Sequence, residues 1–300
     1  MQIVVLGMRS GSSVITRLIN MLGASVGPSE QMMKPSIQNP KGFWEHEAVV
    51  LLNNRLLKTQ GCVWNSIGPF DGRNVLPGAY PEHADEARKL LAELDQARPW
   101  VLKDPRMSLL MPFWRPLLEK PVIAIIYRHP LEVARSLKTH HTMPLLCGLA
   151  LWEQYTRTLL RDSIGMPRLL VSYNALMQDP VAQLKTIHDR LTAYGAIPLC
   201  MPATEAIGEF VEPAFYREKH DAAEVAAMMC PEQQRLFEAL EDASALAWPE
   251  VPEISLRSLE MLRTYDELHL RRWNESVMQK RLKEAELRAA ALEQQLAPKG

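Results

Sequence analysis

Two segments of this sequence combine an apolar run with arginine and small hydroxyl residues. The first, Gln2 to Ser13, reads Q-I-V-V-L-G-M-R-S-G-S-S, and the second, Val122 to Ser136, reads V-I-A-I-I-Y-R-H-P-L-E-V-A-R-S. A short β-branched run is typical of a buried parallel strand. The start of a following helix offers unpaired N–H groups and a positive dipole end, which favour an anion. Two such junctions in one sheet predict a ligand with two separate phosphate-like groups.

The first junction differs from a Walker A loop. That loop requires G-x-x-x-x-G-K-[ST], in which the lysine reaches the terminal phosphates of a nucleotide. Here three residues separate Gly7 from Gly11, and Ser12 stands where the lysine is required. The spacing disfavours an ATPase or a nucleoside-triphosphate kinase. Backbone N–H groups around Ser10–Ser13 and the Arg9 guanidinium still predict a cradle for an anion.

Strand and helix patterns alternate along most of the chain. Helical periods are predicted over 12–22, 47–58, 82–97, 107–118 and 145–161. Further strands are predicted over 100–103, 122–127 and 168–173, the last followed by a helix that begins near Asn174 or Asp179 and ends at Leu191. This alternation predicts an α/β fold with a central parallel sheet flanked by helices, and binding chemistry at the carboxyl ends of the strands. The Gly-, Pro- and Asn-rich stretch 61–81 predicts a surface excursion.

Composition excludes several classes of protein. At 300 residues and 47% hydrophobic content the chain can form one large core or two modest ones, and a net charge of -1 disfavours wrapping duplex nucleic acid. The four cysteines form no C-x-x-C pair, which argues against a zinc knuckle and a disulfide scaffold. The apolar stretch Ile3 to Leu6 is too short for a signal peptide or a membrane span. We therefore expect a cytoplasmic protein.

The carboxyl-terminal stretch from Ser255 to Leu296 is rich in Glu, Arg and Lys and contains no Gly or Pro. It predicts one or two long helices. Three leucines lie multiples of seven apart, but Glu275 and Ala289 occupy the intervening heptad positions. A solvated helix and a helix that forms a homodimer both remain open. The chain is divided accordingly into a main domain over 1–254 and a helical extension over 255–300.

Together, the two junctions resemble the nucleotide-binding elements of sulfotransferases that use 3'-phosphoadenosine 5'-phosphosulfate (PAPS). The second junction has the spacing R-x-P-x-x-x-x-x-S from Arg128 to Ser136. Other segments are similar to a bacterial branch of the family: N-P-K-G-F-W-E-H at 39–46, V-L-K-D-P-R at 101–106 and L-A-L-W at 149–152. The resemblance implies the P-loop nucleotide-kinase-like fold of that family. It implies that the loop around Arg9, Ser10, Gly11, Ser12 and Ser13 binds the 5'-phosphosulfate, and that Arg128 and Ser136 bind the 3'-phosphate.

Two more residues are assigned by this resemblance. S-Y-N-A-L-M-Q-D-P at 172–180 is similar to the family's Y-E-D-L-x-x-D-P stretch, which implies that Tyr173 lies near the nucleotide. Asn174 and Ala175 replace the acidic pair of that stretch. Lys103 matches the family's lysine at the end of a strand, which implies a role in the transfer itself.

The resemblance also implies a general base for the acceptor hydroxyl. Cytosolic relatives have a histidine two residues after the lysine, where this chain has Pro105. Other sulfotransferases use a glutamate, and the candidates here are Glu45 and Glu30. Glu30 lies 21 residues after Arg9, a separation similar to that in tyrosylprotein and trehalose sulfotransferases. We prefer Glu45, because it belongs to the N-P-K-G-F-W-E block of the bacterial branch.

The implied activity is sulfuryl transfer from PAPS to a hydroxyl acceptor, a carbohydrate or a small metabolite, without a metal. Two alternatives remain: a non-catalytic scaffold that binds a partner through its helical tail, and an atypical small-molecule kinase. Loops 61–81 and 201–217 are expected to line the acceptor site. Arg106 is a candidate acceptor-side cation or a partner for Asp104. The histidines lack a set of metal-binding partners and are expected to face solvent: His129, His140 and His141.

Overall fold

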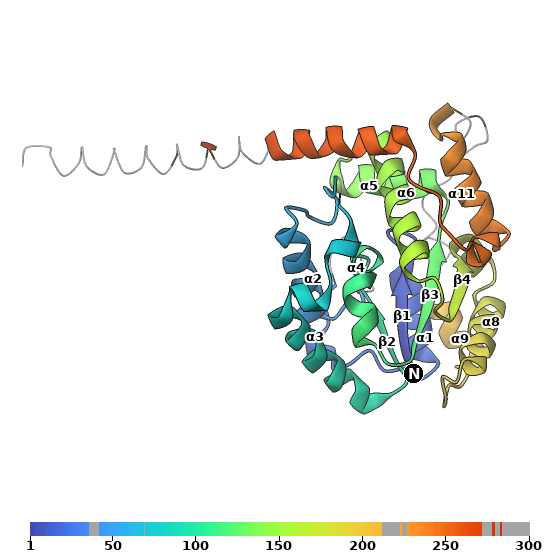
Figure 1. Cartoon of the computed structure of the whole chain (residues 1–300). Helices are drawn as coiled ribbons and strands as arrows, with labels where there is room; N and C mark the ends of the chain where they lie inside the picture. Colours follow the sequence, from blue (N-terminus) through green and yellow to red (C-terminus); the bar gives the residue numbers. More distant parts are fainter. Residues whose placement is uncertain are drawn as a thin grey trace, which may run out of the picture.

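The computed structural model describes residues 1–35, 42–68, 70–211, 223, 227–271, 278–279 and 283. At its centre is a parallel sheet with the strand order β2-β1-β3-β4 (Figure 1). The strands are β1 (Gln2–Leu6), β2 (Trp100–Lys103), β3 (Pro121–Tyr127) and β4 (Arg168–Ser172). The predicted α/β fold with a central parallel sheet is confirmed.

Strand β1 shows why the middle of each strand is apolar. Val4 lies in register with Leu102 of β2 on one side and with Ile123 of β3 on the other. Successive side chains of a strand point to opposite faces of the sheet. Val4 therefore enters one hydrophobic core, whereas Ile3 and Val5 enter the core on the opposite face. Both faces of the sheet are covered, so a polar residue within β1 would be buried on either side.

Helices supply the other half of each core. On the face of Ile3 and Val5 lie α1 (Ser12–Met21), α7 (Tyr173–Gln178), α8 (Pro180–Ala193) and α9 (Thr204–Phe210). On the face of Val4 lie α2 (Glu47–Thr59), α3 (Pro81–Leu94), α4 (Met107–Trp114), α5 (Pro130–His141), α6 (Leu145–Asp162) and α11 (Pro231–Glu241). None of the helices in the described part of the chain is long and apolar enough to cross a membrane.

Two helices differ from their predicted extents because of prolines. The helix expected over 107–118 ends at Trp114 and continues as the 3₁₀ helix η5 (Arg115–Leu117). Pro116 lacks an N–H group, and in an α-helix continued through it the ring would clash with the carbonyl four residues earlier. After β4, the chain forms both α7 and α8, because the Asp179 side chain accepts a hydrogen bond from Ala182 N at 3.0 Å and caps a second helix that starts at Pro180.

The stretch 61–81 is more than the predicted surface excursion. Its apolar residues Ile67, Phe70 and Val75 are buried in the core on the α4 side of the sheet. The turn-forming residues between them had suggested a solvent-exposed loop, but the apolar side chains anchor it. This stretch therefore has a defined position relative to α4 and α6.

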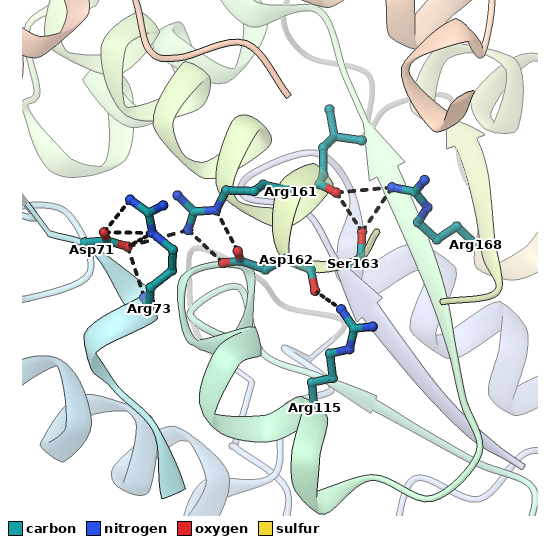
Figure 2. Close-up of polar contacts among 8 residues, drawn as sticks. Asp71, Arg73, Arg115, Arg161, Asp162, Ser163 and Arg168 are labelled. Carbon is teal, nitrogen blue, oxygen red and sulfur yellow. Dashed lines mark hydrogen bonds and ion pairs between the residues drawn. The ribbon is translucent and has the colours of Figure 1, made fainter. Parts of the chain in front are cut away.

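Arginines satisfy the carboxyl end of α6 (Figure 2). The last carbonyl groups of a helix have no partner within the helix and form its negative dipole end. Arg168 donates to the Leu160 carbonyl at 3.1 Å, and Arg115 donates to the Asp162 carbonyl at 3.4 Å. These contacts join the end of α6 to β4 and to η5.

A second set of ion pairs joins α6 to the 3₁₀ helix η2 (Gly72–Asn74), as Figure 2 shows. Arg161 pairs with Asp162 at 2.6 Å and lies 3.8 Å from Asp71, which pairs with Arg73 at 2.7 Å. Each guanidinium of this set has a carboxylate partner. Of these pairs, the Arg161–Asp71 pair connects α6 to the start of η2.

Residues 256–271 form a helix that crosses above α5 and α6 (Figure 1). Its Leu262 and Tyr265 side chains are buried in the main core. Before and within its first turn, the Ser255 and Ser258 hydroxyls donate to the buried Glu153 carboxylate at 2.8 and 2.6 Å. Most of the predicted extension beyond 271 lies outside the described residues. The division at residue 254 and a homodimer through the extension stay predictions.

Candidate functional site

The carboxyl ends of the four strands border one cavity of about 360 Å³, here called the strand-end cavity. This volume lies within the range of small-molecule sites, about 300–1,000 Å³. Most of the residues predicted for the site line it: Arg9, Gly11, Ser12, Ser13, Glu45, Lys103, Arg128, Ser136 and Tyr173. Of the predicted residues, all of which the structure describes, Ser10 and Glu30 do not line the cavity.

The loop after β1 is shaped by close approaches to β3 and to Tyr173. A Cβ atom on Gly7 would lie 2.3 Å from the Ile126 carbonyl oxygen, and one on Gly11 would lie 2.3 Å from the Tyr173 ring. Both glycines have positive φ, 141° and 89°, a conformation that residues with a Cβ rarely adopt. The Ser10 hydroxyl donates to the Ile126 carbonyl at 2.8 Å. Ser10 therefore fastens the loop to β3, and the loop residues on either side of it line the cavity.

Arg9 connects the two junctions. It has a φ of 53°, which is uncommon for a residue other than glycine, and its side chain donates to Ser136 Oγ from Nη2 at 2.9 Å and from Nε at 3.2 Å. Burial and the nearby Arg128 guanidinium lower the pKa of Arg9. Two like charges are thus held near each other in a poorly hydrated site. An anion between them would relieve that repulsion.

Arg128 is held on two sides. Its Nε donates to the buried Glu132 carboxylate at 2.8 Å, one helical turn further along the chain. Its Cζ lies 4.7 Å from the centre of the Tyr173 ring, which is within the range of a cation–π contact. The guanidinium is therefore fixed in orientation at the cavity, next to the first residue after β4.

Lys103, at the end of β2, forms an ion pair with Glu45, and the side chains are only 3% and 8% exposed. The Lys103 ammonium also donates to the Phe43 carbonyl at 3.2 Å and to Ser13 Oγ at 3.4 Å. On the other side of the carboxylate, Arg106 Nη1 lies 3.7 Å from Glu45 Oε2. A buried carboxylate is thus placed between two cations, within reach of the loop that follows β1.

Arg106 has both of the features considered from sequence. It pairs with Asp104 at 2.9 Å and it lines the cavity. Its Nε atom is buried and has no hydrogen-bond partner among the described residues. The Arg106 Nε–H group is therefore a donor that the ion pair with Asp104 does not use.

The two candidate bases occupy different environments. Glu30 is exposed in the 3₁₀ helix η1 (Ser29–Gln31), where the Ser29 hydroxyl donates to it at 3.3 Å. Glu45 is buried at the cavity. The N-P-K part of the motif at 39–46 lies outside the described residues, whereas Gly42 to His46 are described.

Several cavity residues were missed or misjudged from the sequence. His140 and His141 line the cavity and His129 is buried, so the expectation that these histidines face solvent is wrong. A signal existed for His140, which lies four residues after Ser136 and hence on the same face of α5. Trp64 and Tyr155 also line the cavity. From the predicted acceptor loops, Trp64 of 61–81 takes part, whereas none of the described residues 201–211 does.

The described lining carries an excess of positive charge. Arg9, Lys103, Arg106 and Arg128 are cationic, and Glu45 is the carboxylate among these residues; with the buried partners Asp104 and Glu132 counted as well, one positive charge remains. Such an excess in a recessed site attracts a polyanion. Within the described residues, no three His, Cys, Asp or Glu side chains are grouped so that they could hold a metal ion.

No family model matches this sequence, and no curated protein sequence matches it. Among solved structures, the sulfotransferase domain from the Synechococcus PCC 7002 olefin synthase is similar, with a TM-score of 0.41 and 17% identity over 88% of this chain and 94% of that chain. The sulfotransferase domain from the curacin biosynthetic pathway is similar with a TM-score of 0.41 and 15% identity, over 88% of this chain and 96% of that chain.

Proposed function

We propose that this protein is a cytoplasmic, PAPS-dependent sulfotransferase that acts on a hydroxyl group of a carbohydrate or small metabolite. The observation that carries the proposal is the convergence of Arg9 and Arg128 on one cavity, where the Arg128 guanidinium is close enough to contribute to the lowered pKa of Arg9. PAPS carries anionic groups at two ends of one nucleoside, as two such junctions require. The main domain over 1–254 supplies these residues.

The order of the strands supports the proposed arrangement of the donor. The loop after β1 offers backbone N–H groups, Arg9, Ser12 and Ser13 to the 5'-phosphosulfate. The junction after the neighbouring β3 offers Arg128 and Ser136 to the 3'-phosphate. Tyr173, at the end of β4, lies beside both junctions because it contacts Gly11 and Arg128.

The transfer itself needs alignment and charge stabilisation. The acceptor oxygen forms a bond to sulfur while the bond between sulfur and the bridging oxygen breaks, and its electron pair leaves with adenosine 3',5'-bisphosphate. Glu45 accepts the hydroxyl proton. Lys103 contacts both Glu45 and Ser13, so it can stabilise the charge that develops on the bridging oxygen.

Calorimetry with two nucleotides tests this proposal. We expect adenosine 3',5'-bisphosphate to bind and ATP with Mg²⁺ to bind much more weakly, and labelled PAPS to transfer its label to members of a panel of sugars, lipids and phenols. Arg128→Ala should weaken bisphosphate binding by about 2 kcal/mol, the size of a charge-assisted contact. Lys138→Ala, an exposed change on α5, the helix that begins two residues after Arg128, is the matched control. Preference for ATP would instead support a kinase, and binding of neither nucleotide would support a scaffold.

A further inference from the structure

We propose that Trp64 determines which acceptors enter the strand-end cavity, and that Asp266, on the helix formed by 256–271, is the residue that positions it. This proposal rests on the proposed function, because it concerns the acceptor side of the same cavity. The two residues are connected through Ser66, two positions after Trp64, whose hydroxyl donates to Asp266 Oδ1 at 2.7 Å.

The strand order separates the two ends of the cavity. Tyr173 follows β4 at one edge of the sheet and Arg106 follows β2 at the other. Neighbouring strands lie ~4.8 Å apart, so these edges are separated by about 14 Å. The proposed donor residues follow β1, β3 and β4, which leaves the β2 edge, with Glu45 beside Arg106, for the acceptor.

Trp64 belongs to this acceptor side. The Tyr155 hydroxyl donates to the Trp64 carbonyl at 2.6 Å. Tyr155 and Arg106 line the cavity together, and the Arg106 guanidinium opposes the rise in the pKa of Tyr155 that burial causes. The Trp64 ring meets the His141 ring edge to face, with centroids 4.7 Å apart. Tyr155 and His141 also line the cavity, so Trp64 is part of a continuous cavity wall.

The apolar character of this wall suggests the shape of the acceptor. Met33, Phe43 and Pro105 line the cavity together with Trp64. Aromatic faces pack well against flat apolar surfaces. We therefore infer that the acceptor presents a flat face, as a sugar ring or a phenol does, and that Trp64 selects it over a straight-chain alcohol.

The turn that carries Trp64 is short and is held from outside. Val63 and Ser66 exchange two backbone hydrogen bonds of 3.0 Å, with Trp64 and the next residue at the tip. The Asp266 carboxylate accepts from Ser66 and also lies against the chain at Gly68, where an added Cβ would be 2.0 Å from Asp266 Oδ2. The Asp266 carboxyl is half-buried, and burial raises its pKa while the hydrogen bond from Ser66 opposes the shift.

The helix can serve as a fixed support because its first turns are anchored in the main core. Tyr265, the residue before Asp266, is buried there, and so is Leu262. At its start, Ser255 and Ser258 donate to the buried Glu153 carboxylate of α6. The Ser66–Asp266 hydrogen bond therefore connects the turn that carries Trp64 to a helix that lies about 200 positions further along the chain.

The experiment compares acceptor kinetics with local backbone exchange in the full chain. We expect Asp266→Ala to raise the acceptor KM about three- to tenfold, the effect of one lost hydrogen bond, and to leave kcat and the bisphosphate Kd within about twofold. Hydrogen exchange of residues 62–68 should become faster, with no change in residues 7–13. Asp266→Asn, which keeps an accepting oxygen, should stay near wild type, as should Glu267→Ala, an exposed change on the same helix.

Further variants separate the possible outcomes. Ser66→Ala should reproduce Asp266→Ala, the double variant should add little to either, and Trp64→Leu should erase the preference for ring-shaped acceptors over straight-chain alcohols. Wild-type exchange and KM in Asp266→Ala would overturn the proposal, as would equal losses of acceptor and bisphosphate binding. Because the exchange measurement needs no activity, a chain without sulfotransferase activity would refute the proposed function while still reporting whether Asp266 holds the turn.

Discussion

The Arg9 guanidinium and the Ser136 hydroxyl are hydrogen-bonded, at 2.9 Å from Nη2, although the two residues lie 127 positions apart in the chain. They follow the neighbouring strands β1 and β3. A serine hydroxyl can accept from Arg9 and still donate its own hydrogen to an anion. The two junctions therefore form one connected polar site, with Arg128 beside it.

Removal of either side chain tests this connection. We expect Arg9→Ala to weaken binding of adenosine 3',5'-bisphosphate by about 2 kcal/mol and Ser136→Ala by about 1 kcal/mol, as for a charge-assisted and a neutral hydrogen bond. Because the residues contact each other, the loss in the double variant should be smaller than the sum of the single losses. Calorimetric titrations measure all three values, and strictly additive losses would contradict a connected site.

Glu45→Gln should abolish transfer. A glutamine amide cannot accept the hydroxyl proton, so we expect kcat to fall by about 10²- to 10⁴-fold with the bisphosphate Kd nearly unchanged. Glu30→Gln is the matched control and should retain activity, because Glu30 is exposed outside the cavity. Glu45→Gln also removes the carboxylate that pairs with Lys103, so thermal unfolding must show that this variant is folded at the assay temperature. Turnover like that of the wild type in Glu45→Gln would shift the role of base to Glu30.

Gly11→Ala should damage the cavity through sterics alone. The new methyl group would meet the Tyr173 ring, and residue 11 has a φ of 89°, so we expect a loss of about 1–3 kcal/mol in the free energy of unfolding and weaker bisphosphate binding. Gly78→Ala is a suitable control, since no atom lies within 4 Å of its added Cβ. Chemical denaturation and calorimetry would measure both effects. Equal behaviour of the two variants would show that the loop after β1 is not packed against Tyr173.

Acid should destabilise the end of the sheet at which β1 and β2 begin, because Asp95 becomes protonated there. Its carboxylate accepts from Arg98, Trp100 and Gln2, and the Arg98 contact is the main reason that its pKa is lowered from 3.8 to about 2. Because the folded pKa lies below the ordinary value, this stabilisation is present above pH 4 and is lost as the pH falls toward 2.

We therefore expect Asp95→Asn to lower the free energy of unfolding at pH 7 and to flatten its decline between pH 4 and pH 2. Urea unfolding at a series of pH values measures this. Asp85→Asn, which removes an exposed ion pair with Arg88, should change stability by less than about 1 kcal/mol. A decline in Asp95→Asn as steep as in the wild type would assign the acid sensitivity to other carboxylates.

The strands and the junctions after them could be predicted because their signals are local. The middle of a strand that is buried on both faces must be apolar, as 3–6 of β1 and 122–126 of β3 are, and the glycines and hydroxyl residues of the first loop lie close together in the chain. Asp179 was one of the two starts predicted for the helix after β4, and α8 begins at the proline that follows it. In each case the residues that determine an element lie in that element or next to it in the chain.

The acceptor side could not be predicted in this way. Trp64 contacts Tyr155 and His141, and Ser66 contacts Asp266, across separations of tens to hundreds of residues that leave no periodic trace. The turn-forming residues of 61–81 suggested a loop in solvent because composition does not show which apolar side chains find a core. His141 faces the cavity because of how α5 packs on α6, and no property of its own segment reveals that orientation.

A structure of the complex with adenosine 3',5'-bisphosphate tests the central claim most directly. We expect one nucleotide in the strand-end cavity, with its 5'-phosphate within hydrogen-bonding distance of the loop that carries Arg9 and its 3'-phosphate within hydrogen-bonding distance of Arg128 and Ser136. A nucleotide bound elsewhere, or one whose two phosphates both lie away from these guanidinium groups, would contradict it.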